Sequence, residues 1–347
     1  MQNYNNLNQF KAHQKIKVGI STGDPNGVGI EIILKIFQDK DIFELFTPIV
    51  FSSIGILSDQ KKHFKLKTEL NSIKNINQLS SQKLNVIEAA SKNYKISFGE
   101  PSKESGEIAL NSFTDATNAL KNGDIDILLT GPFDKSTVIG QNYNFLGHTE
   151  YLNQELNGEA MMIMVSKKIK IALITEHVPI NKVSSYLSKK MLTKKIEQLS
   201  KTLKFDFGIK DHKIAVLGLN PHAGDNGYIG NEEENIIKPV IKDFLKKGLN
   251  ISGPFSSDAF FGNKHYLGYD IVLAMYHDQG LIPFKTISFG EGTNFTAGLD
   301  KVRTSPDHGT AYDIAGKGIA KINSFRQSFF LAREIFLMRN DRIKSSF

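Results

Sequence analysis

The sequence predicts an α/β protein with a largely parallel sheet. Short apolar strands alternate with longer amphipathic stretches, which is the pattern of parallel strands joined by helices. Polar and glycine-rich residues also cluster directly after several of these strands. The chain has 347 residues, which favours two domains over one.

The predicted elements follow in chain order. Strands are expected over Ile16–Ser21, Ile49–Ser53, Ile125–Thr130, Ile169–Thr175, Lys213–Leu219 and Tyr269–Met275. Helices are expected over Gly29–Phe37, Ile108–Lys121, Lys190–Lys204 and Glu232–Lys247. The first 15 residues are rich in Asn and Gln and lack an apolar segment. We expect them to be a frayed or disordered extension and not a secretory signal.

Composition excludes several kinds of site. There is no cysteine, which excludes disulfides, cysteine-bound zinc, iron–sulfur clusters and thiol nucleophiles. The net charge of +7 favours anionic partners, although a lysine-rich composition alone would also produce it. No arginine-rich tract or zinc finger indicates nucleic-acid binding, and no apolar run approaches the roughly 20 residues of a membrane span. A cytoplasmic protein is expected.

The candidate chemistry lies after the predicted strands. The segments GDPNG, GPFDK, EHVPIN, NPHAGDNG and YHDQG each follow a strand. Ligands of open α/β sheets bind outside the carboxyl ends of the strands. We therefore expect these segments to form the functional site.

Three of the nine histidines occupy equivalent positions. His177, His222 and His277 each stand two or three residues past a predicted strand. Three imidazoles at one sheet edge could hold a divalent metal and leave positions open for substrate. The alternative is that they are hydrogen-bonding loop residues, and the spacing alone leaves both open.

A second candidate is His148 with Thr149, in GHTEYL at the start of a predicted helix. Free backbone N–H groups there could bind an anion. Alternatively, Thr149 simply caps the helix. The other histidines without polar neighbours in sequence are assigned to the surface: His13, His63, His212 and His265.

The segment from His277 to Gly318 is predicted to be loop-rich and to bind a ligand. It carries Lys285, Asn294, Arg303 and Thr304 among several glycines. Lys and Arg bind phosphate through charge-assisted hydrogen bonds, and glycine lets the backbone approach a ligand closely. The alternative is an irregular surface excursion. No G-x-G-x-x-G follows a strand, and neither a P-loop nor a G-x-S-x-G elbow is present.

Taken together, these segments resemble the 4-hydroxythreonine-4-phosphate dehydrogenase family of pyridoxal phosphate biosynthesis. The matching stretches run in order from about residue 17 to 320: GISTGDPNGVGIEI, LLTGPFDK, LGHTEYL, TEHVPI, LNPHAGDNGYIGNEE, GPFSSDAFF, YHDQGLIPFK, FGEGTNFTAGL and RTSPDHGTAYDIAGKG. The last stretch also resembles the cofactor loop of isocitrate and isopropylmalate dehydrogenases.

The resemblance implies two α/β/α domains of the isocitrate/isopropylmalate dehydrogenase kind, with the active-site cleft between them. The first domain would comprise 16–140 with about 305–347, and the second about 141–304, carrying the metal and most substrate ligands. A homodimer with its active site at the subunit interface is also implied.

The resemblance assigns roles to the candidate residues. The metal ligands would be His177, His222 and His277. The substrate ligands would be His148, Thr149, Lys285, Asn294 and Arg303. Catalytic roles would fall to Lys285, Asp258 and Asp278, although either aspartate could instead be a turn or cap residue. Contacts to NAD(P) would come from His308, Gly309 and Asp313, unless this loop only caps the final helix. The metal would be zinc, cobalt, magnesium or manganese.

The implied reaction is oxidation of 4-phosphohydroxy-L-threonine by NAD(P), with decarboxylation to 3-amino-2-oxopropyl phosphate. One alternative is a sister dehydrogenase for threonate or erythronate 4-phosphate. A three-histidine metallohydrolase and a non-enzymatic sensor of phosphorylated ligands are alternatives of other classes. The sequence does not distinguish NAD from NADP.

Overall fold

A computed structural model describes residues 15–89, 94–138 and 147–345. The chain divides into two compact units. Of the described residues, the first unit holds those up to 138 together with 308–322, and the second holds 147–307 together with 323–345. The predicted extension over 1–15 lies outside the described residues, apart from Lys15.

The first unit is built on parallel strands in the order β3-β4-β2-β1-β5. The strands are β1 (Ile16–Ser21), β2 (Phe46–Phe51), β3 (Leu70–Ile73), β4 (Leu84–Ile87) and β5 (Ile127–Thr130). The helices are α1 (Gly29–Ile36), α2 (Ile42–Leu45), α3 (Ile54–His63), α4 (Lys103–Asn122) and α5 (Lys135–Val138). The central strands β1, β2 and β5 are buried almost throughout, as a parallel sheet covered on both faces requires.

Helix α4 shows how local sequence sets these boundaries. The Ser102 hydroxyl accepts the Ser105 N–H at 3.0 Å, and the Ser105 hydroxyl accepts the Ser102 N–H at 3.1 Å, so the two serines form a reciprocal cap. At the other end Gly123 adopts φ 81°, a left-handed conformation that ends helices at little cost for glycine.

The second unit has the strand order β12-β11-β6-β7-β10-β8-β9. Its strands are β6 (Gly158–Val165), β7 (Lys170–Leu173), β8 (Ile214–Leu217), β9 (Ile251–Phe255), β10 (Ile271–Ala274), β11 (Thr293–Leu299) and β12 (Val302–Pro306). Strands β7, β10, β8 and β9 are parallel, whereas the pairs from β12 to β7 are antiparallel.

The helices of the second unit follow most of these strands. They are α6 (His148–Glu155), α7 (Val183–Tyr186), α8 (Lys189–Phe205), α9 (Lys238–Lys246), α10 (Ser257–Gly262), α11 (His277–Ile287) and α12 (Asn323–Ser345). Helix α8 begins at Ser188, whose hydroxyl accepts the Met191 N–H at 3.2 Å. It buries the apolar stripe of an amphipathic helix, formed by Leu192, Ile196, Leu199 and Leu203.

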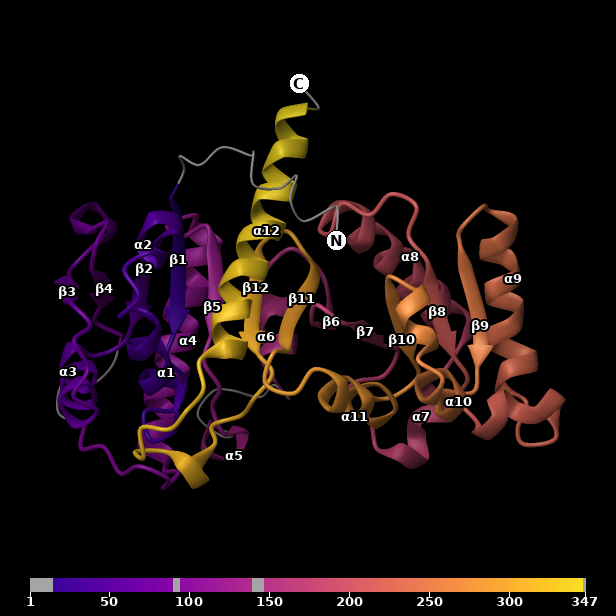
Figure 1. Cartoon of the computed structure of the whole chain (residues 1–347), viewed down its shortest axis with the longest axis horizontal. Coiled ribbons are helices and arrows are strands. Elements are labelled where there is room, and N and C mark those ends of the chain that lie inside the picture. Colours follow the sequence, from indigo (N-terminus) through magenta and orange to yellow (C-terminus); the bar gives the residue numbers. More distant parts are fainter. Residues whose placement is uncertain (1–14, 90–93, 139–146, 346–347) are drawn as a thin grey trace. The chain divides into compact units, whose positions relative to one another are not determined.

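The long helix α12 belongs to the second unit. It contacts β12 and β11, and Figure 1 shows it in front of β12. The sequence assigns about 305–347 to the first domain, and the observed grouping differs in that only 308–322 lies there. The apolar face of α12, including Phe325, Phe329 and Ile335, is buried, which accounts for its docking on these strands.

The core of the second unit brings α11 close to β7. Buried residues on one side of the sheet include Ile171, Leu173 and Phe284. A Cβ on Gly280 of α11 would stand 2.7 Å from the Leu173 side chain and 2.9 Å from that of Ile171. Glycine at this position therefore lets α11, and with it His277, approach the strand.

The predicted α/β class with a largely parallel sheet is confirmed, and each predicted strand and helix has an observed counterpart with boundaries shifted by a few residues. The prediction that His277 to Gly318 is loop-rich is wrong over much of its length. That segment contains α11 and the antiparallel strands β11 and β12. None of the described helices is both long and apolar enough to span a bilayer.

Two glycines with similar backbones provide a matched test of close packing after β1. Gly23 (φ 70°) would place a Cβ 2.1 Å from the Pro132 carbonyl oxygen, whereas Gly123 (φ 81°) has nothing within 4 Å. Gly123→Ala should cost about 1 kcal/mol, from left-handed strain alone. Gly23→Ala should cost at least about 2 kcal/mol, because overlap adds to the same strain. Urea unfolding of both variants checks this, and equal losses would contradict it.

Candidate functional site

The pairing of three strands gathers the predicted metal histidines. Strands β7, β10 and β8 are adjacent and parallel, so their carboxyl ends share one edge. Pairing of the β7 and β10 segments continues to Thr175, whose N–H and hydroxyl both donate to the Met275 carbonyl, at 3.2 and 2.8 Å. Both partners lie two residues before a histidine. The rings of His177 and His277 consequently come within 6.1 Å, centroid to centroid.

His277 is the first residue of α11 and is oriented by its neighbour. Its Nδ1 lies 2.7 Å from Oδ1 of Asp278. A proton on Nδ1 would donate to this carboxylate and leave Nε2 as a ligand, the arrangement common for metal-binding histidines. Asp278 thus has a positioning contact in addition to its predicted catalytic role.

Gln279 fastens the ends of β10 and β8 together. Its Oε1 accepts the Met275 N–H at 2.6 Å. Its Nε2 donates to the Gly218 carbonyl at 2.6 Å and to the Ser257 hydroxyl at 2.8 Å. One side chain therefore ties the segment before His277 to the segment before His222 and to the start of α10.

His222 lies in a left-handed turn. Residues 222 to 226 all have positive φ, from 44° at Asp225 to 81° at Gly224. Four of the five are not glycine, and each carries a cost of about 1 kcal/mol or more in this conformation. Such strain persists only where the surroundings hold it.

The buried carboxylate of Glu233 holds this turn. Its Oε1 accepts the N–H groups of Leu219 and Asn220 at 2.7 and 2.8 Å, and its Oε2 accepts Nδ2 of Asn220 at 2.9 Å. Glu233 is fully buried, and a Cβ on Gly224 would stand 2.6 Å from its Oε2. The turn therefore folds around the carboxylate, and only glycine fits where it closes.

Asp258 lies in the first turn of α10, and His222 is one of the groups that affect its pKa. The Ser256 hydroxyl, first of all, and the Ala259 N–H lower the pKa of Asp258, and His222 acts in the same direction. The carboxylate is exposed and remains charged near neutral pH. Asp258 and Asp278 also line a cavity of about 550 Å³ between α10 and α11.

The residues fit a divalent metal in type and position, because three imidazoles follow three adjacent strands with carboxylates beside them. Their side chains do not close a site as they stand. Within the described part of the chain, no group of three or more His, Asp or Glu side chains is close enough to hold an ion. Closing the set would require the rings of His177, His222 and His277 to turn toward one point.

Two predicted substrate ligands lie on neighbouring antiparallel strands. Asn294 is on β11 and Arg303 on β12, where Arg303 is paired with Thr296. Asn294 is two residues before Thr296, so it points to the same face as Thr296 and its cross-strand partner Arg303. Arg303 is only 2% exposed and its Nη1 donates to the Thr296 hydroxyl at 3.0 Å. Among the described residues, Oδ1 of Asn294 is buried without a hydrogen-bond partner, which suits a ligand-facing amide.

The remaining predicted substrate ligands lie on helices. His148 and Thr149 are the first two residues of α6, and Gly147 occupies the cap position without a side-chain cap bond. Thr149 is therefore not the cap residue. Lys285 is exposed on α11, eight residues after His277, or about 12 Å along a helix axis.

The predicted cofactor residues lie in the first unit. His308, Gly309 and Asp313 belong to the segment 308–322, which packs against the loop after β1. The Val28 N–H donates to the Thr310 carbonyl at 3.0 Å, and the Tyr312 hydroxyl donates to Oδ2 of Asp24 at 2.8 Å. In the described structure, Nε2 of His308 is buried without a hydrogen-bond partner.

Asp24 is a buried carboxyl at the centre of this contact. It is 1% exposed and also accepts the Ser105 hydroxyl at 2.9 Å and the Asn26 N–H at 2.8 Å. Burial raises the pKa of Asp24, against the lowering effect of these hydrogen bonds. Burial likewise raises the pKa of Tyr312, helped by the Asp24 charge, so Tyr312 is a hydrogen-bond donor at every physiological pH.

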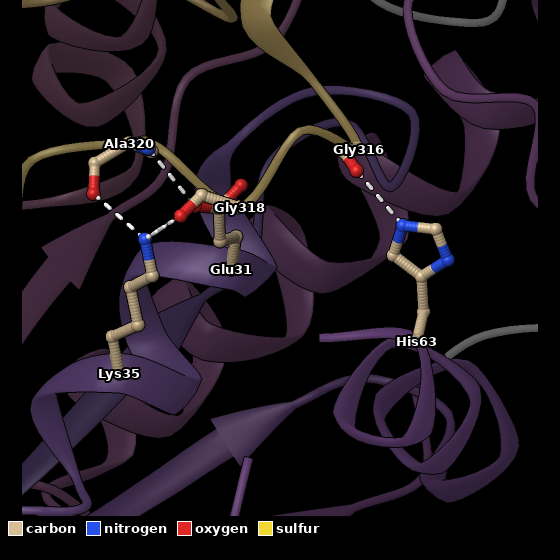
Figure 2. Close-up of polar contacts among 6 residues, drawn as sticks. All are labelled: Glu31, Lys35, His63, Gly316, Gly318 and Ala320. Atoms are coloured by element: carbon tan, nitrogen blue, oxygen red, sulfur yellow. Dashed lines mark hydrogen bonds and ion pairs between the residues drawn. The ribbon is translucent and has the colours of Figure 1, made fainter. Parts of the chain in front are cut away.

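The surface assignment of the other histidines holds only in part. It is wrong for His212, which is 6% exposed and bonds to Ser200 and to the Ile209 carbonyl. His63 is exposed, but its Nε2 lies 2.8 Å from the Gly316 carbonyl oxygen (Figure 2). His265 is exposed. His13 lies outside the described residues.

Sequence reasoning missed the residues that position the site. Besides Glu233, Gln279 and Asp24, Glu176 was missed, although it precedes His177 and accepts the Met162 N–H at 3.2 Å. Glu176 and Gln279 could have been found as polar side chains within two residues of a strand-end histidine. Glu233 could have been found as an acidic residue of the stretch GNEE, which follows His222.

Comparison with known proteins identifies the family. The family model described as "Pyridoxal phosphate biosynthetic protein PdxA" matches residues 44–332. The chain belongs to the PdxA family. A 4-hydroxythreonine-4-phosphate dehydrogenase from Bacteroides thetaiotaomicron is 41% identical over 327 residues, covering 94% of this chain and 90% of the relative.

Further members carry related names. The crystal structure of a 4-hydroxythreonine-4-phosphate dehydrogenase from Klebsiella pneumoniae superposes with a TM-score of 0.79 at 32% identity, covering 93% of this chain and 98% of that one. A provisionally named D-threonate 4-phosphate dehydrogenase from Oceanobacillus iheyensis is 35% identical, covering 92% of this chain and 97% of its own. These PdxA relatives are named as dehydrogenases, which supports an oxidoreductase.

Glu233 and its neighbour Glu234 form a matched pair for testing the turn around His222. Glu233→Gln leaves one acceptor oxygen for three donors and should lower the free energy of unfolding by about 1–3 kcal/mol. Glu234 is a partly exposed ion-pair partner of Lys238, so Glu234→Gln should change it by about 0.5 kcal/mol at most. Urea unfolding measures both, and similar values for the two variants would contradict the role of Glu233.

The raised pKa of Asp24 predicts how the stability of the fold depends on pH. Its pKa in the folded protein lies above the ordinary 3.8, so as the pH falls the folded state takes up this proton before the unfolded chain does. The stability of the natural protein relative to Asp24→Asn should therefore rise as the pH falls from neutral toward the ordinary value of 3.8. Urea unfolding of both proteins across that range checks the sign, and a relative stability that falls on acidification would contradict it.

Proposed function

We propose that this protein is a 4-hydroxythreonine-4-phosphate dehydrogenase of vitamin B6 biosynthesis. Its substrate would be 4-phosphohydroxy-L-threonine, and its product 3-amino-2-oxopropyl phosphate, the precursor of pyridoxine 5'-phosphate. Membership of the PdxA family and the names of its relatives support this assignment. The observation that carries it is that His177, His222 and His277 each follow one of three adjacent strands of one unit, with the rings of His177 and His277 6.1 Å apart.

The proposed chemistry needs two groups that the chain would bind. NAD(P), when bound beside His308, Gly309 and Asp313, would supply a hydride acceptor. A divalent metal, when bound by the three histidines, would supply a Lewis acid for the alcohol and ketone oxygens. The identity of the metal and the choice between NAD and NADP remain open to measurement.

The substrate's phosphate and carboxylate would be held by His148, Thr149, Lys285, Asn294 and Arg303. The buried guanidinium of Arg303 supports an anion site on one face of β11 and β12. The unpaired amide oxygen of Asn294 on the same face would accept a hydrogen bond from the ammonium or a hydroxyl group of the substrate. Fixing both anionic ends would hold the alcohol carbon in place for reaction.

Proton transfers would fall to the ionisable side chains near the histidines. The alcohol must lose one proton, and the carbon that loses carbon dioxide must gain one. Asp258 would accept a proton as a carboxylate, and the lowering of its pKa by Ser256 makes it a weaker base than an ordinary aspartate. Asp278 is held against His277, and the ammonium of Lys285 can donate a proton or pair with an anion.

A second candidate is oxidation of D-threonate 4-phosphate, because a relative at 35% identity bears that name. The same metal and phosphate residues would serve both substrates. A three-histidine metallohydrolase or a non-enzymatic sensor is disfavoured, because the named relatives are dehydrogenases. We also propose a homodimer with an interfacial active site, as the family resemblance implies. Sedimentation at the mass of one chain would contradict it.

Turnover tests the assignment directly. NADH or NADPH should form from 4-phosphohydroxy-L-threonine with a higher kcat/KM than from D-threonate 4-phosphate, and a chelator should abolish turnover. The reverse preference would favour the second candidate. Absence of nicotinamide reduction with either substrate would reject both dehydrogenase assignments.

Alanine substitutions test the metal ligands. His177→Ala, His222→Ala and His277→Ala should each lose bound metal and lower kcat/KM by at least about a hundredfold, while the fold is retained. His265→Ala is the control, since His265 is exposed and distant in sequence from the strand ends. Elemental analysis and circular dichroism provide the readouts. Full metal occupancy in the three site variants would show that other residues bind the ion.

A further inference from the structure

The segment carrying the proposed cofactor residues is fastened to α1 by a buried ion pair. Glu31 and Lys35 stand four residues apart on the otherwise apolar helix GIEIILKI, and Lys35 Nζ lies 2.6 Å from Oε1 of Glu31. Glu31 is fully buried, while the Lys35 side chain keeps 21% exposure. A charged pair on this face must be compensated by further hydrogen bonds.

Those bonds go to the segment 308–322. Lys35 Nζ donates to the Gly318 carbonyl at 2.9 Å and to the Ala320 carbonyl at 3.0 Å. Oε1 of Glu31 accepts the Ala320 N–H at 2.9 Å. Figure 2 shows the two side chains meeting at Ala320, with His63 reaching Gly316 separately. The pair thus binds both backbone groups of Ala320.

All three N–H donors of the Lys35 ammonium are used. An ammonium has three N–H donors, and Lys35 has three acceptors. Removing the lysine would free two backbone carbonyls and leave a buried carboxylate without its counter-ion. The second oxygen of Glu31 already lacks a hydrogen-bond partner in the described structure, so the charge depends on Lys35.

The segment 308–320 contains residues whose backbone would be flexible without these anchors. Gly316 and Gly318 adopt φ 78° and 72°, and Ala311 adopts φ 47°. Hydrogen bonds from Val28 to Thr310 and from Tyr312 to Asp24 fix the amino-terminal end of this segment. Hydrogen bonds to Lys35 and Glu31 fix its carboxyl-terminal end. Asp313 lies between these two anchors. A loop fixed at both ends pays less ordering entropy when it binds a ligand.

We propose that the Glu31–Lys35 pair is a positioning device that preorganises the segment 308–320 for the dinucleotide. The inference rests on the proposed function, which assigns this segment to NAD(P). Neither side chain need touch the cofactor. Their effect is to hold Gly318 and Ala320 as the carboxyl-terminal anchor, so that Asp313, between the two anchors, keeps one arrangement relative to His308 and Gly309, which precede the amino-terminal anchor.

Three variants test the proposal: Lys35→Met, Glu31→Gln and the double variant. Lys35→Met should raise KM for the dinucleotide roughly tenfold, a cost of about 1.4 kcal/mol, and leave KM for the phosphorylated substrate unchanged. Amide hydrogen exchange in peptides covering 309–320 should accelerate. The double variant removes both charges, so it should regain stability relative to Lys35→Met without regaining dinucleotide affinity.

The control is Lys238→Met, which breaks another i,i+4 Glu–Lys pair, on the partly exposed surface of α9. It should alter neither exchange in 309–320 nor either KM. Binding of NAD⁺ and NADP⁺ by calorimetry separates two kinds of failure. Unchanged exchange in Lys35→Met would overturn the positioning role. Faster exchange with unchanged dinucleotide affinity would overturn the link to the cofactor, whereas absence of turnover in the natural protein would reject only the proposed reaction.

Discussion

The parallel pairing of β7, β10 and β8 is the constraint on which the candidate site depends. Three neighbouring strands in one direction end at one edge, and each is followed within five residues by a histidine. Continued pairing through Thr175 and Met275 holds two of the histidine segments in register. A slip of one residue would turn alternate side chains to the other face and separate them.

Buried and partly buried polar side chains hold the segments at this edge in place. Glu233 and Gln279 bind backbone N–H groups next to a histidine segment, and Glu176, beside His177, binds the Met162 N–H on β6. In the first unit, Glu31 accepts the Ala320 N–H and Asp24 accepts the Tyr312 hydroxyl, so both hold the segment 308–320. Each buried carboxylate is costly unless its partners are all present. The protein therefore accepts a stability cost, together with the strain of the left-handed turn at His222, for fixed loop geometry.

Much of the fold was predictable from sequence. The predicted strands β1, β2, β5, β7, β8 and β10 are short, buried apolar runs, and α8 and α9 carry an apolar stripe at helical spacing. Strands β3, β4, β6 and β9 were not predicted. Strands β11 and β12 were missed because Asn294, Gly298 and Arg303 break the usual strand composition. Their pairing with β6 comes from tertiary contacts that propensity does not encode. The buried position of His212 was missed for the same reason, since its partner Ser200 lies on α8.

The anchoring residues were hidden for another reason. Glu31 and Lys35 are visible as charges on an apolar helix, but their partners at Gly318 and Ala320 lie some 285 residues away. The same holds for Asp24 and Tyr312, which are 288 residues apart. Sequence spacing predicts which chemistry is present at a strand end, whereas only the fold shows which buried group holds it in place.

The central claim is that the ends of β7, β10 and β8 form one metal site. Anomalous diffraction at the absorption edge of the metal, from crystals of the metal-loaded protein, tests it most directly. The account predicts one anomalous peak with a nitrogen of each of His177, His222 and His277 at about 2.0–2.3 Å. A peak bound by other residues, or one that lacks any of these three ligands, would contradict it.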